Sequence, residues 1–279
     1  MKLTDVSKTA VATLRSHVIE SKGKNPIMND PMAVYCLEKM LSLFSDRDRA
    51  LLLDRKLLSS LTSHIALRAR KYDSIVNDFI RNNPAPVVVN LGCGFDTRFW
   101  RIDNEKCRYL ELDLPEVIEL KKKILKEHLN YELIGCSVLD VSWIDKITAI
   151  SDQHVILIAE GLFMYLEKGA VINLINKIAD SFRNSRLVLE VVTEKYTRGL
   201  WKKIVAMKIK RALGLDAGSY YNFGVGDAHE MESYGKGIKI IDEWSYVEDD
   251  DIRPAILKLF KNSRTFTKTQ WTVTAALNA

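Results

Sequence analysis

Two glycines and an acid are spaced in a way that suits a nucleotide-type ligand. Gly92 and Gly94 follow the apolar run 86–91, and Asp113, with Leu114 after it, lies 113 − 92 = 21 residues beyond the first glycine. Glycine in a turn after a strand lets the backbone approach a ligand closely. An acid about 20 residues further on is where a ribose hydroxyl pair is bound in such folds. These residues therefore predict a nucleotide-type site at the end of a buried strand.

The residues after the second glycine separate two classes of ligand. A dinucleotide site has a third glycine three residues later, which allows tight helix packing and places a pyrophosphate at the helix N-terminus. Here Thr97 takes that position and Asp96 precedes it. A carboxylate there would repel a pyrophosphate and would suit the sulfonium and amino group of S-adenosylmethionine, although Asp96 could instead only cap a helix. We therefore expect the methyl donor rather than a nicotinamide dinucleotide.

Other polar residues stand where later strands are expected to end. Asp140 and Val141 follow the third predicted strand, where an acid can accept a hydrogen bond from an adenine amino group. Glu160 and Gly161 close the fourth strand, and Tyr165 lies in the turn after it. Ligands of open α/β sheets bind outside the carboxyl ends of the strands. Each residue alone could be an ordinary turn residue, but their joint placement favours one ligand crevice.

A parallel sheet must bring these strand ends together, and the hydrophobic pattern predicts one. Short apolar runs rich in β-branched residues alternate with amphipathic stretches, which is typical of a Rossmann-like, doubly wound, mostly parallel α/β sheet. The expected strands are 86–91, 108–112, 131–137, 154–160 and 186–192, with helices over 115–129 and 167–182.

We expect a single domain, 1–279, made of four segments. The first, 1–85, is a cap of helices that includes 32–44, begun by Asp30 and Pro31, and 56–81. The donor-binding core, 86–192, follows. In the third segment, 193–236, the alternation stops, and a basic helix precedes a stretch rich in glycine and tyrosine, which predicts a lid over the acceptor. The last segment, 237–279, is expected to hold strands at 237–247 and 264–276 around a helix at 249–261.

The same residues resemble a known family. The segments 90–98 (NLGCGFDTR), 111–121 (ELDLPEVIELK) and 160–166 (EGLFMYL) are similar to the leucine carboxyl methyltransferase family, in particular its bacterial branch of polyketide O-methyltransferases. Shorter similarities lie at 9–10, 30–33 and 68–73, so the resemblance spans residues 9 to 192. It implies the class I methyltransferase fold with S-adenosylmethionine as cofactor.

The resemblance also implies that these residues surround the donor. Arg68 would pair with the carboxylate of the donor's methionine part, which suits a bidentate guanidinium. Cys93 stands where the family more often has alanine, a residue of similar size. The other implied positions are Gly92 along the methionine arm, Asp113 at the ribose, Asp140 and Val141 around the adenine, Glu160 at the amino end, and Asp96 nearby.

The chemistry of transfer leaves the acceptor open. An ionised carboxylate acceptor needs no base, whereas a phenol, with a pKa of about 10, would want one. No residue stands out as that base. Tyr220 and Tyr221 could orient an acceptor or only pack, and His229 could be no more than a solvated loop residue. We expect an O-methyltransferase acting on a carboxyl or hydroxyl group of a small molecule, such as a polyketide-type metabolite. The alternatives are a protein C-terminal carboxyl methyltransferase, a dinucleotide-dependent oxidoreductase and an inactive donor-binding module.

Composition narrows the setting. The net charge of +5 arises from 41 basic and 36 acidic residues, which does not indicate a nucleic-acid partner. No apolar stretch has the length of a membrane span, and the N-terminus lacks a signal-peptide pattern. The four cysteines lack metal-ligand spacing and suit reduced thiols. We expect a cytoplasmic protein without a metal ion.

Overall fold

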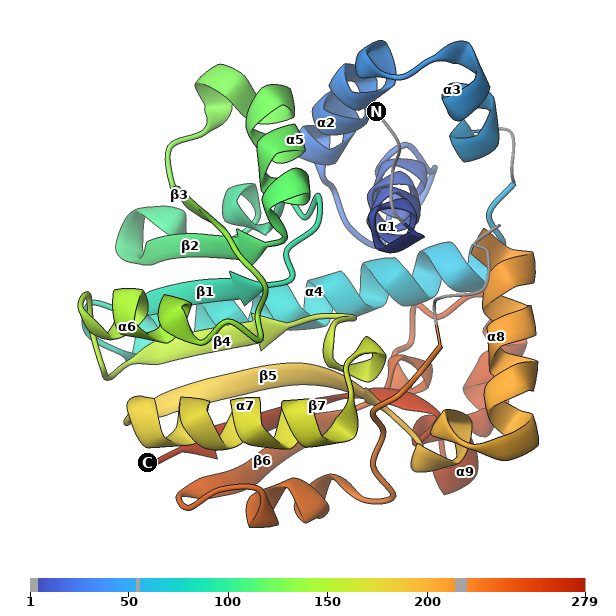
Figure 1. Cartoon of the computed structure of the whole chain (residues 1–279). Helices are drawn as coiled ribbons and strands as arrows, with labels where there is room; N and C mark the ends of the chain where they lie inside the picture. Colours follow the sequence, from blue (N-terminus) through green and yellow to red (C-terminus); the bar gives the residue numbers. More distant parts are fainter. Residues whose placement is uncertain (1–4, 54–55, 214–219, 279) are drawn as a thin grey trace.

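The computed structural model describes residues 5–53, 56–213 and 220–278. Within this part of the chain, one sheet of seven strands has the order β3-β2-β1-β4-β5-β7-β6. All neighbouring strands are parallel except that β7 is antiparallel to both β5 and β6. The predicted doubly wound, mostly parallel sheet is confirmed (Figure 1). The strands are β1 Val87–Leu91, β2 Arg108–Asp113, β3 Glu132–Gly135, β4 Val155–Ala159, β5 Ser185–Val192, β6 Ile238–Trp244 and β7 Gln270–Leu277.

The order of the strands reverses between β1 and β4. From β1 the chain continues outward to β2 and β3, and from β4 it continues in the opposite direction to β5. A crevice opens at such a switch point, outside the carboxyl ends of the strands. In Figure 1 these ends face the helices α1, Asp5–Ser21, and α8, Gly199–Leu213. The fold therefore gathers the predicted site residues at one edge of the sheet.

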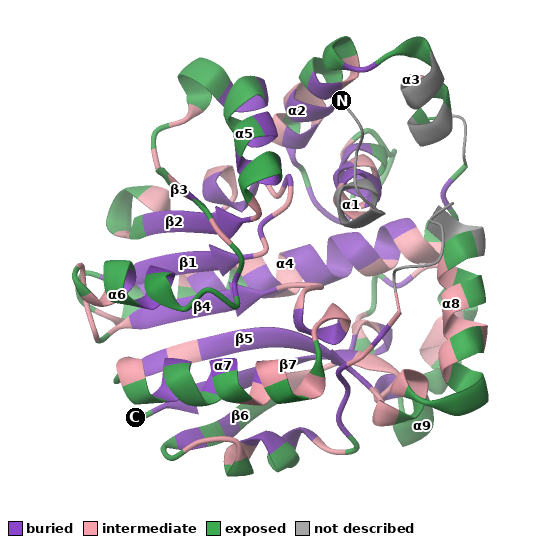
Figure 2. Cartoon of the chain, in the orientation of Figure 1, coloured by how far each residue is buried: buried purple, intermediate pink, exposed green. Residues whose placement is uncertain are grey.

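Helices cover both faces of the sheet, which is why the central strands are apolar on both sides. On one face α4 packs Tyr72, Val76 and Phe79 against alternate strand residues. On the other face α6 and α7 meet the intervening residues. Figure 2 shows the buried strands enclosed in this way. The remaining helices are α2 Pro31–Leu43, α3 Asp46–Leu53, α4 Ser59–Asn82, α5 Pro115–Leu125, α6 Ser142–Thr148, α7 Lys168–Ser181 and α9 Arg264–Thr267.

The predicted start of α2 is confirmed. The Asp30 carboxylate accepts a hydrogen bond from the backbone N–H of Ala33 at 2.9 Å, and Pro31 is in the first turn. By contrast, α3 was not predicted, because its sequence, DRDRALLL, lacks an apolar stripe at helical spacing.

Two predictions for the C-terminal segment are wrong. The segment 249–261 is not an α-helix but holds a 3₁₀ helix, Ala255–Phe260. Pro254 explains this, because within an α-helix it would lack the N–H for an intrahelical hydrogen bond. The last strand begins at Gln270 rather than at residue 264, since residues 264–267 form the short helix α9.

Part of the predicted lid belongs to the core. Phe223, Val225, Ala228 and Met231 are buried in the main core cluster. The backbone N–H of Val225 also donates to the carbonyl of Val192 at 3.0 Å. Residues 214–219 of the predicted lid lie outside the described residues. Of the described residues of this segment, those that remain available to cover an acceptor are α8, Tyr220 and Tyr221.

Candidate functional site

The glycine turn is in direct contact with Asp113, the acid that the sequence predicts at the ribose. Gly92 and Gly94 have φ angles of +62° and +50°, in the left-handed region that favours glycine. The carboxylate of Asp113 accepts hydrogen bonds from the backbone N–H groups of Gly94 and Leu114, both at 2.7 Å. Burial raises the pKa of Asp113, and these two N–H donors oppose that rise. Since a carboxylate has about four lone-pair sites, Asp113 can still accept hydrogen bonds from a diol.

The turn has no room for side chains. A Cβ on Gly92 would lie 2.8 Å from the side chain of Leu162, and one on Gly94 would lie 2.9 Å from Cβ of Ala10 in α1. Gly161, which follows β4, has a φ of +65°, so a side chain there would strain the backbone. The backbone at the switch point is thus a narrow cradle with α1 packed against it.

A buried ion cluster lies beside this cradle. Arg68 donates from Nε to Glu160 and from Nη1 to Glu190, both at 2.7 Å. Arg98, fully buried, bonds Asp73 at 2.8 Å and Glu160 at 2.5 Å. The ion cluster comprises the arginines Arg68, Arg98 and Arg101 and the acids Asp30, Asp73, Asp96, Glu160 and Glu190.

The ion cluster contains more acid than arginine. Five carboxylates face three guanidinium groups, a surplus of 5 − 3 = 2 negative charges. Burial raises the pKa of Glu160, but Arg68 and Arg98 outweigh it and hold that pKa below its usual value. Burial acts in the same way on Glu190, whose pKa Arg68 and His64 hold at about 2. Glu160 and Glu190 are therefore expected to be ionised at neutral pH, and the surplus of acid leaves the site suited to a cation.

Asp96 does not offer a free carboxylate. It pairs with Arg98 and Arg101, both at 3.1 Å, and it also accepts from the side chain of Asn90 at 3.0 Å. Its negative charge is already balanced by protein cations. Asp96 thus links the glycine turn to the ion cluster. Any contact of Asp96 with the donor would come from a carboxylate that is already paired with two arginines.

The residues expected near adenine form an exposed turn after β3. The backbone N–H of Cys136 donates to the carbonyl of Asp113 at 2.9 Å, which sets this turn beside the ribose-type acid. Asp140 accepts from the N–H of Ser142 at 3.2 Å, and Val141 is exposed. Val141 could cover the face of an adenine with its apolar side chain. The carboxylate of Asp140 could accept a hydrogen bond from the adenine amino group.

On the other side of the ion cluster lies an aromatic group, which we define as Tyr165, Tyr196, Tyr221 and Tyr246. The rings of Tyr165 and Tyr221 are 5.6 Å apart. Tyr165, Tyr196 and Tyr221 pack with residues of α8. Burial raises the pKa of Tyr165 to about 12, and the carboxylate of Glu190 adds to the rise. Glu190 also raises the pKa values of Tyr221 and Tyr246 after burial. The aromatic group therefore borders Glu190 at the carboxyl end of β5.

The other two candidate acceptor residues are Tyr220 and His229. The ring of Tyr220 faces Lys202, whose Nζ is 5.7 Å from the ring centroid. His229 is exposed and pairs with Glu232 at 3.2 Å in a surface 3₁₀ helix. The Asp227 and Glu230 capping box builds that helix locally, and the partner of His229 lies within the same helix.

Sequence reasoning missed His64, Glu190, Tyr196 and Tyr246. Glu190 had a signal, because it is the one charged residue in the apolar stretch 187–192. It lies on the α4 face of β5, like Val188, and therefore meets Arg68. His64 precedes Arg68 by four residues and so shares its helix face.

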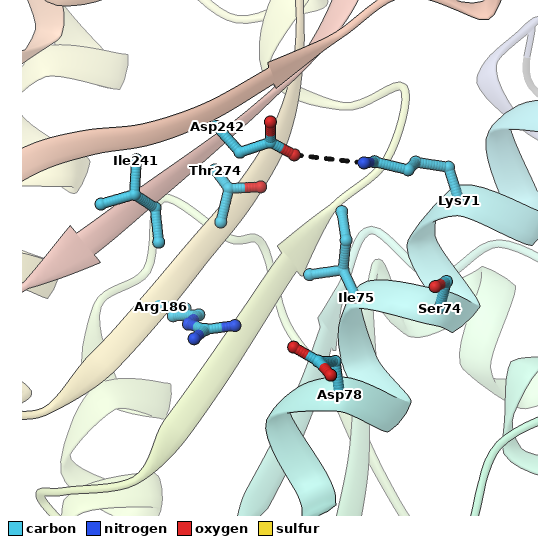
Figure 3. A pocket seen from close by; sticks show the side chains of 8 residues that line it. All are labelled: Lys71, Ser74, Ile75, Asp78, Arg186, Ile241, Asp242 and Thr274. Atoms are coloured by element: carbon cyan, nitrogen blue, oxygen red, sulfur yellow. Dashed lines mark ion pairs between the residues drawn. The ribbon is translucent and has the colours of Figure 1, made fainter. Parts of the chain in front are cut away.

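Figure 3 shows a different cavity, of about 270 Å³, between α4 and the strands β5, β6 and β7. Lys71 and Asp242 form an ion pair across it at 3.1 Å. Arg186, at the beginning of β5, also lines it. The cavity thus lies beside the amino end of β5 and is not part of the crevice at the carboxyl ends.

The glycine cradle, its ribose-type acid and the ion cluster at the switch point fit the methyl donor. The fold is that of class I S-adenosylmethionine-dependent methyltransferases. The magnesium protoporphyrin IX methyltransferase of Synechocystis, solved with S-adenosylhomocysteine, shares it with a TM-score of 0.50 and 14% identity over 82% of this chain and 92% of that one. A geranyl diphosphate methyltransferase, solved with sinefungin, gives a TM-score of 0.51 and 12% identity over 78% and 82%.

The chain belongs to the leucine carboxyl methyltransferase family, whose sequence model matches residues 9–179. It is an S-adenosylmethionine-dependent methyltransferase, which removes the oxidoreductase and inactive-module alternatives. It is 27% identical to the tetracenomycin polyketide synthesis O-methyltransferase TcmP of Streptomyces glaucescens over 91% of this chain and 89% of that protein. The methyltransferase dpfgK of Gibberella zeae is 27% identical over 85% and 81%. Leucine carboxyl methyltransferase 1 of Caenorhabditis elegans is 26% identical over 43% and 46%.

Among the described helices, none is long and apolar enough to cross a membrane.

Proposed function

We propose that this enzyme transfers a methyl group from S-adenosylmethionine to a carboxyl or hydroxyl oxygen of a small aromatic molecule of polyketide type. The observation that carries the proposal is the aromatic group beside Glu190, next to the cradle that fits the donor. Aromatic faces form apolar walls that suit a flat acceptor. The similarity to TcmP, a polyketide O-methyltransferase, over most of both chains supports the same acceptor class.

Different residues of this chain would hold different parts of the donor. Asp113 would accept hydrogen bonds from the ribose, and Asp140 with Val141 would border the adenine. Arg68 and Glu160 would receive the charged amino-acid end. The donor supplies a methyl carbon already activated by a sulfonium, so the protein mainly aligns it with the acceptor oxygen. One net positive charge on the donor would also offset part of the negative surplus of the ion cluster.

We expect S-adenosylhomocysteine to bind with a micromolar dissociation constant and NAD and NADP to show no measurable binding. Thr97 replaces the third glycine of a dinucleotide site, and the negative surplus of the ion cluster would repel a pyrophosphate. Isothermal titration calorimetry with each ligand measures this directly. A tight complex with either dinucleotide would contradict the assigned donor site.

The acceptor class is tested by transfer of a labelled methyl group. We expect small aromatic hydroxy and carboxylic acids to be methylated and a peptide that ends in a leucine carboxylate to be left unmodified. Transfer to the peptide alone would favour the protein C-terminal carboxyl methyltransferase instead. Mass spectrometry of the products identifies the methylated oxygen.

Tyr221→Ala should separate acceptor binding from donor binding. The ring of Tyr221 is buried against Tyr165 and Val192, away from the glycine cradle. Its loss would misplace the acceptor, so we expect transfer to fall at least about tenfold. The affinity for S-adenosylhomocysteine should change less than about twofold, since donor contacts are untouched. Leu259→Ala, at an exposed position of the 3₁₀ helix Ala255–Phe260, is the control that should alter neither quantity. Unchanged turnover in Tyr221→Ala would show that the aromatic group does not receive the acceptor.

A further inference from the structure

We propose that His64 is the general base that removes the proton from a hydroxyl acceptor, and that Glu190 positions its ring. The inference rests on the proposed function, because it needs an acceptor bound against the aromatic group. It also narrows that function, since a carboxylate acceptor would need no base. The acceptor class assigned is therefore an aromatic hydroxyl compound.

The ring of His64 is held in place by stacking and by the carboxylate of Glu190. It stacks on Tyr246, one of the aromatic group, with the ring centroids 3.8 Å apart and the planes at 23°. Its Nε2 lies 3.8 Å from Oε1 of Glu190, and its side chain is only 13% exposed. Glu190 is the polar partner of the ring, and Nδ1 of His64 has no hydrogen bond to any described residue. An imidazole fixed in plane but free at Nδ1 can accept a proton there from a bound molecule.

Other histidines are engaged differently. Nδ1 of His17 is bonded to Asp30 at 3.0 Å, and Nδ1 of His154 to Asn83 at 3.0 Å. His229 is paired with Glu232 on the surface. His64 differs from these because it is nearly buried, free at Nδ1 and beside the aromatic group.

Glu190 is rigid enough to position the ring. Its side chain is 2% exposed, and it accepts hydrogen bonds at 2.7 Å from both Arg68 and Gln270. Facing Nε2, the carboxylate favours the neutral tautomer with hydrogen on that atom. Nδ1 is then the nitrogen left to accept a proton, and Glu190 stabilises the imidazolium once it forms.

The charges around His64 keep it neutral at pH 7, as a base must be. Burial lowers its pKa most. The carboxylates of Glu190 on β5 and Glu160 after β4 raise it, while Arg68 on its own helix lowers it, and the balance lies below the ordinary value. Tyr246, the neighbour from the turn 246–248, has a pKa that burial raises, so it stays neutral too.

The acceptor hydroxyl gives its proton to Nδ1 of His64 while its oxygen forms a bond to the methyl carbon. The carbon–sulfur bond breaks, and its electron pair stays on sulfur, which becomes the neutral thioether of S-adenosylhomocysteine. The imidazolium of His64 then returns its proton to solvent.

The test uses 3-hydroxy-2-naphthoic acid, a flat probe with both a phenol and a carboxyl group, and His64→Gln in the full chain. For the parent we expect the methoxy product rather than the methyl ester. In His64→Gln we expect kcat to fall about 10²- to 10⁴-fold, the usual contribution of a general base. KM and the affinity for S-adenosylhomocysteine should stay within about twofold, which also shows that the variant is folded. His128→Gln, at an exposed position, is the matched control.

The pH profile distinguishes a base from a structural residue. The parent should gain activity as pH rises through the pKa of His64. The variant should lack that rise and recover only when the phenol itself ionises. Proton NMR of the parent should independently place the pKa of His64 below that of an ordinary histidine.

Three results would overturn the inference in distinguishable ways. If His64→Gln forms the methoxy product at the parent rate, or if His64 is charged at pH 7, then His64 is not the general base. If the methyl ester is the sole product, His64 is not needed as a base, but the proposed O-methyltransferase activity still holds. No methylation of the probe by a parent enzyme that binds S-adenosylhomocysteine contradicts the proposed function itself.

Discussion

Replacing Arg98 by methionine should lower the free energy of unfolding by about 3–5 kcal/mol at pH 7, the usual effect of breaking a buried ion pair. Arg98 is fully buried and contacts Asp73, Asp96 and Glu160. Without it, the five carboxylates of the ion cluster share the two remaining arginines, and their negative charges stay out of water. Urea denaturation of the two proteins measures the difference.

The matched control is Arg81→Met. Arg81 also pairs with an acid, Asp78 at 3.4 Å, but both side chains are exposed. A surface pair of this kind contributes at most about 1 kcal/mol, so its loss should be small. Equal stability of Arg98→Met and Arg81→Met would show that the ion cluster does not stabilise the fold as described.

The cost of losing Arg98 should shrink in acid. Arg68 and Arg98 hold the pKa of Glu160 below its usual value, against the effect of burial. A lowered folded-state pKa adds stability above the unfolded-state pKa, and this stability is lost as pH falls through the folded-state value. The parent should therefore lose its advantage over Arg98→Met progressively below about pH 4.5, the ordinary range of a glutamate. A difference that is constant from pH 7 to pH 3 would contradict this origin.

Asp113→Asn and Asp113→Ala should weaken binding of S-adenosylhomocysteine by about 1–3 kcal/mol, which corresponds to roughly 5- to 150-fold. The carboxylate would accept hydrogen bonds from the ribose while it also holds the N–H groups of Gly94 and Leu114. Alanine removes both functions, whereas asparagine keeps one oxygen as an acceptor. Alanine should therefore have the larger effect in calorimetry.

Asp103→Ala serves as the control for Asp113. Asp103 is an acid in the preceding loop that pairs with the exposed Lys106 at 2.7 Å. Its removal should leave donor affinity unchanged. If both Asp113 variants bind S-adenosylhomocysteine like the parent, the ribose contact lies elsewhere.

The core of the fold could be predicted because its signals are local. A run such as 155–159, VILIA, is too short for a stable helix and too apolar for a surface strand. The glycine turn and Asp113 are also local signals, since each follows a recognisable strand. The Asp30 cap needed only its own residue and the proline after it.

The ion cluster could not be predicted, because its partners are distant in sequence. Arg101 joins Asp30, Asp73 and Asp96 through contacts that only the tertiary fold creates. For the same reason, the sequence could not show that Asp96 is paired with Arg98 and Arg101. The sequence also could not show that His64 lies beside Glu190, because that contact depends on how α4 crosses β5.

The position of β7 has a consequence for how the protein is made. β7 lies between β5 and β6, although β6 precedes it in the chain. During synthesis β6 leaves the ribosome with no strand to pair with, and it stays unpaired until residues 270–277 arrive. The outer third of the sheet, with the core contacts of Phe223 and Val225, can therefore consolidate only late. Until then the growing chain exposes apolar sheet edge, which is when it would depend most on a chaperone.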